Sequence, residues 1–133
     1  SDITYRVYDW GRVDKEGKPR PLHTDLALDV IQYEDTGPFK TVYKPQPNRP
    51  VKLIQCPYFT TQRLDADQSV TRDYFALDSF VIYICISGAF SVHYGAEKPV
   101  ALTRGETLLI PAEIKQVTLE PESRGTLLEV FVP

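Results

Sequence analysis

The sequence is poor in the residues that most often carry metal or redox chemistry. Among 133 residues it has no methionine, two histidines and two cysteines. Cys56 and Cys85 lie in apolar, strand-like segments, without a CxxC pair or a Cys/His cluster. A small secreted fold would carry more cysteines in an even framework, and the N-terminus lacks the basic and apolar regions of a signal peptide. We therefore interpret both cysteines as reduced core thiols of a cytoplasmic protein.

Long apolar runs and basic clusters are also missing. The longest apolar run, residues 80–86, is far shorter than the roughly 18 residues of a membrane span and is typical of a buried strand. Fifteen basic and 18 acidic residues give a net charge of −3, whereas nucleic-acid binding rests on phosphate neutralisation by basic side chains. We expect neither a membrane nor a nucleic-acid partner, while a ligand with one anionic group, such as a sugar phosphate, stays open.

The first third of the chain predicts an extended arm and one helix. Residues 3–10 alternate between two faces and are rich in aromatic and β-branched side chains, which predicts a strand. Leu22, Leu26 and Val30 fall on one helical stripe, which predicts a helix of about eight to ten residues. Residues 40–50 contain three prolines and are interpreted as an extended connector.

From residue 51 onward, short strand-like segments alternate with turn signals, which suggests a β-sandwich or jelly roll. The expected segments are 51–62, 68–76, 80–87, 90–94, 99–103, 107–110, 116–119 and 125–132. We place the domain boundary in the connector, so that residues 1–48 form the arm and helix and residues 49–133 form the β domain. The phenylalanines assigned to its core are Phe59, Phe75, Phe80, Phe90 and Phe131.

A glycine and a proline in the second half carry a more specific signal. Gly105, five further residues and Pro111 resemble the second motif of cupin barrels, in which the glycine turns the chain into a strand and the proline ends that strand. Ser87-Gly88 and the segment after it resemble the hairpin that closes the first cupin motif. The expected fold class is therefore all-β: a cupin-like jelly roll or β-sandwich with an N-terminal arm strand and one short crossover helix.

The ligands of a metal-binding cupin are missing from these motifs. A divalent ion needs three or four converging N or O ligands at about 2.0–2.2 Å. Val81 stands at the position of the motif's glutamate, Gln116 stands at that of the histidine after the proline, and Glu113 replaces the usual glycine. The two histidines, His23 and His93, lie in different segments. We expect no cofactor-binding residue and no metal site within this chain.

Acid–base or nucleophilic chemistry has weaker support. Asp73, Asp78 and Glu113 are candidate carboxylates, but no spacing brings two of them together, and we interpret them as solvated turn residues. His93 alternates with apolar neighbours in a hairpin and is expected to point outward or to be satisfied by a hydrogen bond. The sequence holds no GxSxG motif and no recognisable pairing of a nucleophile with a base.

The start of the chain carries the most specific pattern. The block SDITYRVYDW at residues 1–10, LH at residues 22–23 and ALDVI at residues 27–31 resemble the type I mannose-6-phosphate isomerases of the compact bacterial kind. The segment CPYF at residues 56–59 and the glycine–proline motif extend the resemblance over essentially the whole chain. The resemblance implies a zinc-dependent enzyme of two cupin-like barrels that interconverts mannose 6-phosphate and fructose 6-phosphate through an enediol(ate).

The resemblance also implies where the chain lies in such an enzyme. The family's zinc ligands, a Gln-x-His pair, a glutamate and a further histidine, precede the Ser-Asp block that begins here at Ser1. We therefore expect this chain to be the C-terminal part of a longer isomerase, with zinc in the full-length enzyme and no activity in the isolated chain.

Arg6 is the residue to which the resemblance assigns a catalytic role, because it matches the family's active-site arginine. A guanidinium stays charged and offers several donors in a fixed fork, so it would stabilise the charge that develops on an enediolate. Strand alternation would place Arg6 on one face with Tyr8 and Trp10. The resemblance also includes three further residues, which we expect to be structural and to pack the crossover helix: Arg12, Arg20 and His23.

Two other interpretations stay open. The chain could be a free-standing metal-less cupin that binds a sugar or serves as an interaction module, with Arg6 on its surface. It could also be a small cupin enzyme with an unrecognised site, although the near absence of histidine argues against this. If the chain is a fragment, the arm strand has lost its sheet neighbours, and its exposed edge and apolar face predict dimerisation through residues 3–10.

Overall fold

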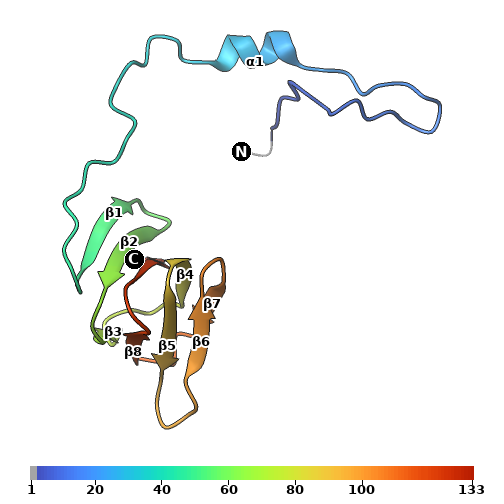
Figure 1. Ribbon diagram of the computed structural model, residues 1–133. Helices are drawn as coiled ribbons and strands as arrows, with labels where there is room; N and C mark the ends of the chain where they lie inside the picture. The colour runs from blue at the N-terminus through green and yellow to red at the C-terminus, as the bar shows by residue number, and fades with distance from the viewer. Residues whose placement is uncertain (1–2) are drawn as a thin grey trace. The chain divides into compact units, whose positions relative to one another are not determined.

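The structure, a computed structural model, describes residues 3–133 and divides between Phe39 and Lys40 into two compact units. The unit that ends at Phe39 contains one helix, α1 (Thr24–Val30), in its described residues (Figure 1). The second unit, Lys40–Pro133, contains the strands. They are β1 (Pro50–Gln55), β2 (Thr60–Ala66), β3 (Val70–Asp73), β4 (Val81–Ser87), β5 (Ala89–His93), β6 (Val100–Thr103), β7 (Thr107–Ile110), β8 (Gln116–Pro121) and β9 (Gly125–Phe131).

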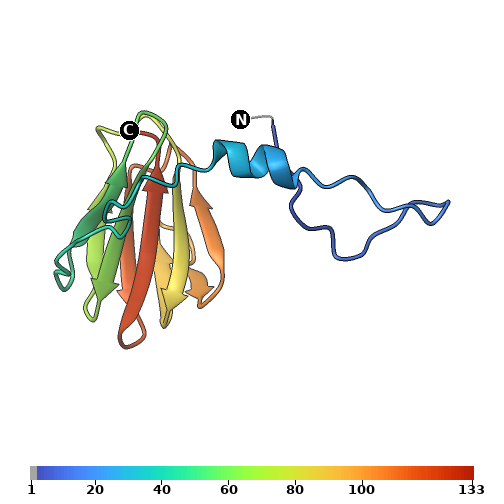
Figure 2. The ribbon, with the colours of Figure 1, turned by 90° about the horizontal axis from the view of Figure 1, so that it is seen from above.

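The strands form two antiparallel sheets. One sheet has the order β1-β2-β9-β4-β7 and the other the order β3-β8-β5-β6. Figure 2 shows β9, in red, between β2 and β4, and the register pairs Leu64 with Leu127 and Cys85 with the same Leu127. Because β9 is the last strand and lies in the middle of its sheet, the C-terminal segment completes the barrel. The expectation of an all-β, cupin-like sandwich with one short helix is confirmed.

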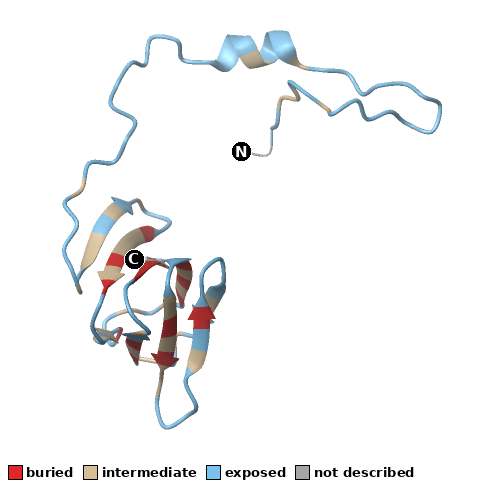
Figure 3. Cartoon of the chain, in the orientation of Figure 1, coloured by how far each residue is buried: buried red, intermediate tan, exposed pale blue. Residues whose placement is uncertain are grey.

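The core lies between the two sheets of the second unit. Alternate residues of β4 are fully buried, namely Val81, Tyr83 and Cys85, as the period of two in a strand requires. Leu127 from β9 and Leu119 from β8 meet them from the two sheets. Figure 3 shows these buried residues in red on the strands, whereas none of residues 3–39 is buried. The second unit therefore holds the hydrophobic core.

The connector is part of the second unit rather than a free linker. Pro47 forms an isolated β-bridge with Asp65, and the Asn48 amide donates to the carbonyl of Asp65 at 2.7 Å. The Asn48 side chain accepts from the amides of Asp67 and Gln68 and donates to the Asp67 carboxylate. Residues 47 and 48 are thereby fixed to the end of β2.

One predicted strand is absent. Residues 3–10 were expected to form an arm strand, but the structure assigns them no strand. The segment ends in a turn in which Trp10 and Gly11 both have positive φ, 49° and 66°. A strand is stable only when a neighbour accepts its backbone hydrogen bonds, and the described chain gives this segment no ladder. The helix, by contrast, is confirmed at Thr24–Val30.

Two further expectations need correction. The segment 51–62 is not one strand but a hairpin, because the Cys56 amide turns back to the carbonyl of Phe59 at 3.0 Å. Of the five phenylalanines assigned to the core, Phe90 is buried and Phe131 packs against the core, whereas the others are exposed at strand ends or in turns. The exposed ones are Phe59, Phe75 and Phe80. The remaining segments are confirmed as strands, with the same ends at 107–110 and shifted ends elsewhere.

Candidate functional site

Arg6, to which the family resemblance assigns a catalytic role, is half-buried and forms hydrogen bonds with the segment before α1. Its backbone amide donates to Nδ1 of His23 at 3.2 Å, and the His23 amide donates back to the Arg6 carbonyl at 2.7 Å. Its guanidinium Nη1 donates to the carbonyl of Pro21 at 3.0 Å. The edge of the Tyr5 ring meets the His23 ring, with centroids 6.3 Å apart. These contacts fix the backbone of Arg6, and among residues 3–133 the guanidinium donates one hydrogen bond, that of Nη1 to Pro21.

Arg20 and Arg12 brace the loop that follows Arg6. Both Arg20 nitrogens Nε and Nη2 donate to the Asp9 carboxylate, at 2.8 and 2.5 Å. The hydrogen bond from Arg20 holds the pKa of Asp9 below its ordinary value. Arg12 lies over the Trp10 ring, 5.8 Å from its centroid. In the described chain both arginines contact the loop, and neither of these contacts is with the helix that they were expected to pack.

The cupin motif is formed, but its positions do not build a metal site. Gly105 takes a φ of +88° at the turn into β7, and Pro111 follows the last residue of that strand. Val81 is buried in the core, and Gln116 and Glu113 are exposed. Within residues 3–133, no three His, Cys, Asp or Glu side chains gather closely enough to hold a metal ion. The aliphatic side chain of Val81 at the carboxylate position has no atom that can bind zinc, so these motif positions do not suit a zinc ion.

A buried polar cluster that the sequence analysis missed occupies the barrel interior. The Arg72 guanidinium of β3 forms two hydrogen bonds to the Glu129 carboxylate of β9, at 3.1 and 3.0 Å. The hydroxyl of Tyr74 donates to Glu129 and shares a short hydrogen bond with the hydroxyl of Tyr83. Glu129 and Tyr83 are 1% and 0% exposed. The cluster thus joins the two sheets across the core.

Burial governs the protonation of this cluster. It raises the pKa of Tyr74 and of Tyr83 above their ordinary value, because a charged phenolate would lose its hydration beside the Glu129 carboxylate. Burial is the largest single influence on the pKa of Arg72 and lowers it, but attraction to Glu129, the hydrogen bonds to Glu129 and the nearby tyrosines together outweigh burial, and the net shift is upward. In the described residues no buried side-chain polar atom lacks a hydrogen-bond partner. A fully satisfied cluster of this kind stabilises the fold and offers no group poised for reaction.

The one signal for this cluster in the sequence is a carboxylate at an inward position. In β9, Leu127 is buried, so the period of two places Glu129 on the same inner face. A buried carboxylate requires a cationic or hydrogen-bonding partner. Its partner Arg72 lies 57 residues away in the sequence, and the sequence alone does not bring the two together.

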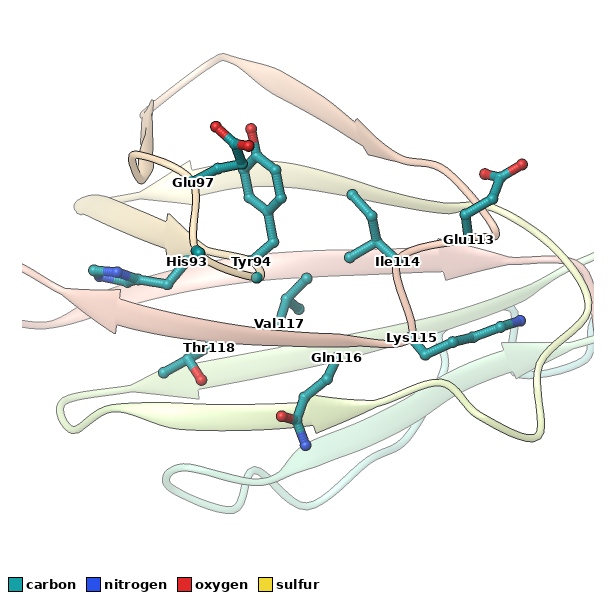
Figure 4. A pocket seen from close by; sticks show the side chains of 11 residues that line it. His93, Tyr94, Glu97, Glu113, Ile114, Lys115, Gln116, Val117 and Thr118 are labelled. Atoms are coloured by element: carbon teal, nitrogen blue, oxygen red, sulfur yellow. The ribbon is translucent and has the colours of Figure 1, made fainter.

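A cavity of about 600 Å³ opens between the β5–β6 turn and the loop before β8 (Figure 4). Tyr94, Ile114 and Val117 provide its apolar lining, and Gln116 contributes an amide. Its rim carries three charged side chains: Glu97, Glu113 and Lys115. The Lys115 ammonium donates to the carbonyl of Leu77 at 2.9 Å. Such a mixture of aromatic, amide and carboxylate groups suits a small neutral polyol better than a strongly anionic ligand.

The other candidate polar residues have local partners. His93 forms a hydrogen bond to Glu120 at 2.9 Å on the outer side of β5, as its interpretation as a satisfied histidine predicted. The Asp73 carboxylate accepts from the amide of Phe75 and closes a turn. Both cysteines are free thiols, and burial raises the pKa of Cys85. Within the described residues no helix has the length and apolarity of a membrane span.

Comparison with known proteins decides the family. Residues 50–132, the strands of the second unit, match the family model of the mannose-6-phosphate isomerase cupin domain. The chain belongs to this family. A mannose-6-phosphate isomerase from Streptococcus mutans is 30% identical to this chain over 125 residues. The alignment covers 86% of this chain and 36% of the relative. Mannose-6-phosphate isomerase ManA of Bacillus subtilis is 30% identical over 122 residues, 90% of this chain and 38% of ManA.

Solved structures agree that the chain belongs to the mannose-6-phosphate isomerase family. The crystal structure of the mannose 6-phosphate isomerase from Bacillus subtilis matches 98% of this chain and 40% of its own length, with a TM-score of 0.69 and 26% identity. A cupin-2 domain protein from Shewanella frigidimarina matches 79% of this chain with a TM-score of 0.55 and 14% identity, which supports the cupin fold alone. The chain spans a little over a third of the curated isomerases that it matches.

Proposed function

We propose that this chain is the C-terminal portion of a mannose-6-phosphate isomerase, an aldose–ketose isomerase that interconverts mannose 6-phosphate and fructose 6-phosphate. The proposal rests most on the match of residues 50–132 to the isomerase cupin domain. The curated isomerases that align with 86–90% of this chain support it, because the similarity also includes the arm. In this proposal residues 1–48 complete the catalytic barrel, and residues 49–133 form a metal-less second cupin in the cytoplasmic enzyme.

Arg6 is the catalytic residue that this chain contributes. Isomerisation moves a proton between C1 and C2 of the sugar, and negative charge develops on the substrate oxygens. A guanidinium aimed at those oxygens stabilises the charge where it forms and needs no change of protonation. The two hydrogen bonds between Arg6 and His23, from the Arg6 amide to the His23 imidazole and from the His23 amide to the Arg6 carbonyl, support this role, because they hold the arginine backbone in one position. Preorganised donors of this kind act without reorganising during the reaction.

The zinc ion belongs to the full-length enzyme in this proposal, held by residues upstream of the Ser-Asp block. The aliphatic Val81 at the carboxylate position and the exposed Gln116 at the histidine position support this division of labour. The satisfied Arg72–Glu129 cluster supports it too, since it fills the barrel interior with groups that already have partners. The second cupin then acts as a support for the catalytic region, and the isolated chain is inactive.

The test is the substitution of Arg6 in the full-length protein. Arg6→Ala is expected to lower kcat by about 10²–10³-fold, the size found when one preorganised donor to an oxyanion is removed. Zinc content and the melting temperature should not change. Lys18→Ala is the matched control, because Lys18 is a cation at an exposed turn that pairs with Glu16. A normal kcat in the Arg6 variant would refute the assigned role.

The alternative, a free-standing metal-less cupin that binds a sugar, is favoured by one observation. The cavity in Figure 4 combines the Tyr94 ring with the Gln116 amide and two carboxylates, groups that suit sugar hydroxyls. This alternative predicts chemical-shift changes at Tyr94 and Gln116 when the isolated chain is titrated with mannose. It also predicts that mannose 6-phosphate binds no better, because Glu97 and Glu113 repel a phosphate. Titration without any such change would remove the alternative.

A further inference from the structure

The outer face of the five-stranded sheet carries aliphatic side chains on four of its strands, β1, β4, β7 and β9. Because Val81, Tyr83 and Cys85 of β4 point into the core, alternation directs Ile82, Ile84 and Ile86 outward. The register aligns Ile82 with Leu109 of β7 and with Val130 of β9. We call the aliphatic residues of this face the outer aliphatic row: Ile54, Ile82, Ile84, Leu109, Leu128 and Val130.

The register aligns these residues in lines across the sheet, with Thr61 of β2 between the aliphatic residues of β1 and β9. Val130 pairs with Thr61 of β2, which in turn pairs with Ile54 of β1, so one line crosses all five strands. In the next line Ile84 pairs with Leu128. Leu109 is 53% exposed and Ile54 49%, and the other members of the row are half-buried. Hydrophobic side chains that lie side by side on an outer face mark an interaction surface, whereas single ones do not.

The opposite sheet shows that this pattern is specific to one face. In the four-stranded sheet the outward residues of β5 are Ser91 and His93, since Phe90 and Val92, which alternate with them, are buried. Ser91 pairs with Glu120, and His93 pairs with Thr118. That sheet follows the usual antiparallel pattern, apolar toward the core and polar toward water. The five-stranded sheet departs from this pattern, because it also carries aliphatic side chains on its outer face. These side chains point away from the core and do not contribute to it.

The connector reaches the barrel over the same outer face. Arg63 of β2 points outward in the register, opposite Leu128, and its Nη1 donates to the hydroxyl of Tyr43 at 2.9 Å. Further along β2, Asp65 bridges to Pro47 and accepts from Thr126 at 2.7 Å. One end of this face is therefore already covered by residues that precede β1, and the outer aliphatic row begins beside them.

We propose that the outer aliphatic row is the docking surface for the region that precedes the matched segment in the isomerase relatives. The inference rests on the proposed function. The chain spans 36% and 38% of two such relatives, so most of their length lies outside the matched segment. Tyr43 and Pro47 lie at one end of this face, so the row begins beside the residues through which the chain enters the second unit. The row is uncharged, so its occupant presents a complementary apolar face, packed as one sheet or helix layer on another.

The test compares the methyl groups of the row in two proteins: this chain alone at low concentration, and the full-length gene product. A soluble paramagnetic compound broadens the NMR signals of exposed methyl groups. The signals of Ile82, Ile84 and Leu109 should broaden strongly in the chain alone and several-fold less in the full-length protein. Ile84→Lys should restore the broadening at Ile82 and Leu109 in the full-length protein. Ser91→Lys, at the centre of the opposite sheet, is the matched control and should not.

The other outcomes separate the docking proposal from the proposed function, and the first two contradict the docking proposal. If the row is already protected in the chain alone, or becomes protected only as the chain dimerises, the occupant is a part of this chain or a second copy. If the row stays exposed in a full-length protein that turns over mannose 6-phosphate, the docking proposal fails while the proposed function stands. Protection of the row in a full-length protein without zinc or turnover would support docking and refute the proposed function.

Discussion

Arg72 and Glu129 form a two-pronged ion pair across the inside of the barrel, from an edge strand of one sheet to the middle strand of the other. The Glu129 side chain is 1% exposed and that of Arg72 is 19% exposed. Charged groups in such a position are rarely tolerated without a partner, because desolvation costs more than most single contacts return. The pair therefore links the two sheets of this cupin across the core.

Removing Arg72 should be costly. Arg72→Met leaves the Glu129 carboxylate buried without its cation, and breaking a buried pair in this way costs about 3–5 kcal/mol of the free energy of unfolding. Lys18→Ala, which breaks an exposed pair with Glu16, should cost less than about 1 kcal/mol. Urea denaturation of the three proteins measures both values. Equal losses in the two variants would show that the buried pair contributes no more than a surface pair.

Removing both charges should be cheaper than removing one. The double variant Arg72→Met with Glu129→Leu leaves no buried charge unpaired, and replacement of a buried pair by apolar residues is often neutral or stabilising. We expect it to recover most of the stability that Arg72→Met loses. The same denaturation experiment provides the coupling energy between the two sites. A double variant less stable than either single variant would contradict this account of the pair.

Stability should fall in alkaline solution. Burial raises the pKa of Tyr74 and of Tyr83, so both hydroxyls stay protonated in the folded protein above pH 10, where unfolded tyrosines ionise. The unfolded state then binds fewer protons, and the free energy of unfolding decreases with pH by about 1.4 kcal/mol per unit for each tyrosine. Tyr74→Phe should remove about half of this slope. Tyr58→Phe, at an exposed turn, should leave it unchanged, and equal slopes in both variants would contradict the prediction.

Two glycines with positive φ should respond differently to alanine. At Gly105, with a φ of +88°, a Cβ would meet no atom within 4 Å, so Gly105→Ala should cost roughly 1–2 kcal/mol from the backbone alone. At Gly88, with a φ of +77°, a Cβ would lie 2.6 Å from the Arg124 carbonyl oxygen, and overpacking adds to the strain. We expect Gly88→Ala to cost roughly 2–5 kcal/mol. Thermal unfolding compares the two, and a milder effect at Gly88 would contradict the packing of β4 and β9.

The isolated chain is expected to self-associate through residues 3–10. Val7 and Trp10 are 57% and 73% exposed, and apolar side chains grouped in this way promote association. The pair of substitutions Val7→Ser and Trp10→Ser should lower the apparent mass in light scattering at high concentration. Ile84→Lys tests the sheet face in the same assay, so the two surfaces can be told apart. A monodisperse monomer of the unmodified chain at high concentration would contradict the expectation.

The sequence predicted those elements whose ends are set by local chemistry. β7 runs over Thr107–Ile110, as expected, because Gly105 supplies the turn before it and Pro111 ends it. The hairpin at residues 56–59 was missed, since its turn contains a proline but no glycine to signal a reversal. Residues 3–10 have the composition of a strand, but composition does not supply the neighbour that a strand needs. Local signals thus located the strands of the barrel, but they also predicted a strand at residues 3–10 that the structure does not form.

The candidate site was less accessible to sequence reasoning. Arg6 was found through a family pattern, and the structure adds its pairing with His23, a contact 17 residues apart. The Arg72–Glu129 pair depends on which strands face each other across the sandwich, and that is a property of topology rather than of any local motif. The continuous apolar run at residues 80–86 predicts a buried strand. In the described chain its inward residues Val81, Tyr83 and Cys85 are buried, whereas the isoleucines between them are not.

The central claim is that this chain is the second, metal-less part of a zinc-dependent mannose-6-phosphate isomerase. The most direct measurement is zinc content together with turnover of mannose 6-phosphate, made on the isolated chain and on the full-length gene product in parallel. The account predicts neither zinc nor turnover in the isolated chain, and stoichiometric zinc with turnover in the full-length protein. Stoichiometric zinc with turnover in the isolated chain would contradict it, because the residues described here would then have to build the site.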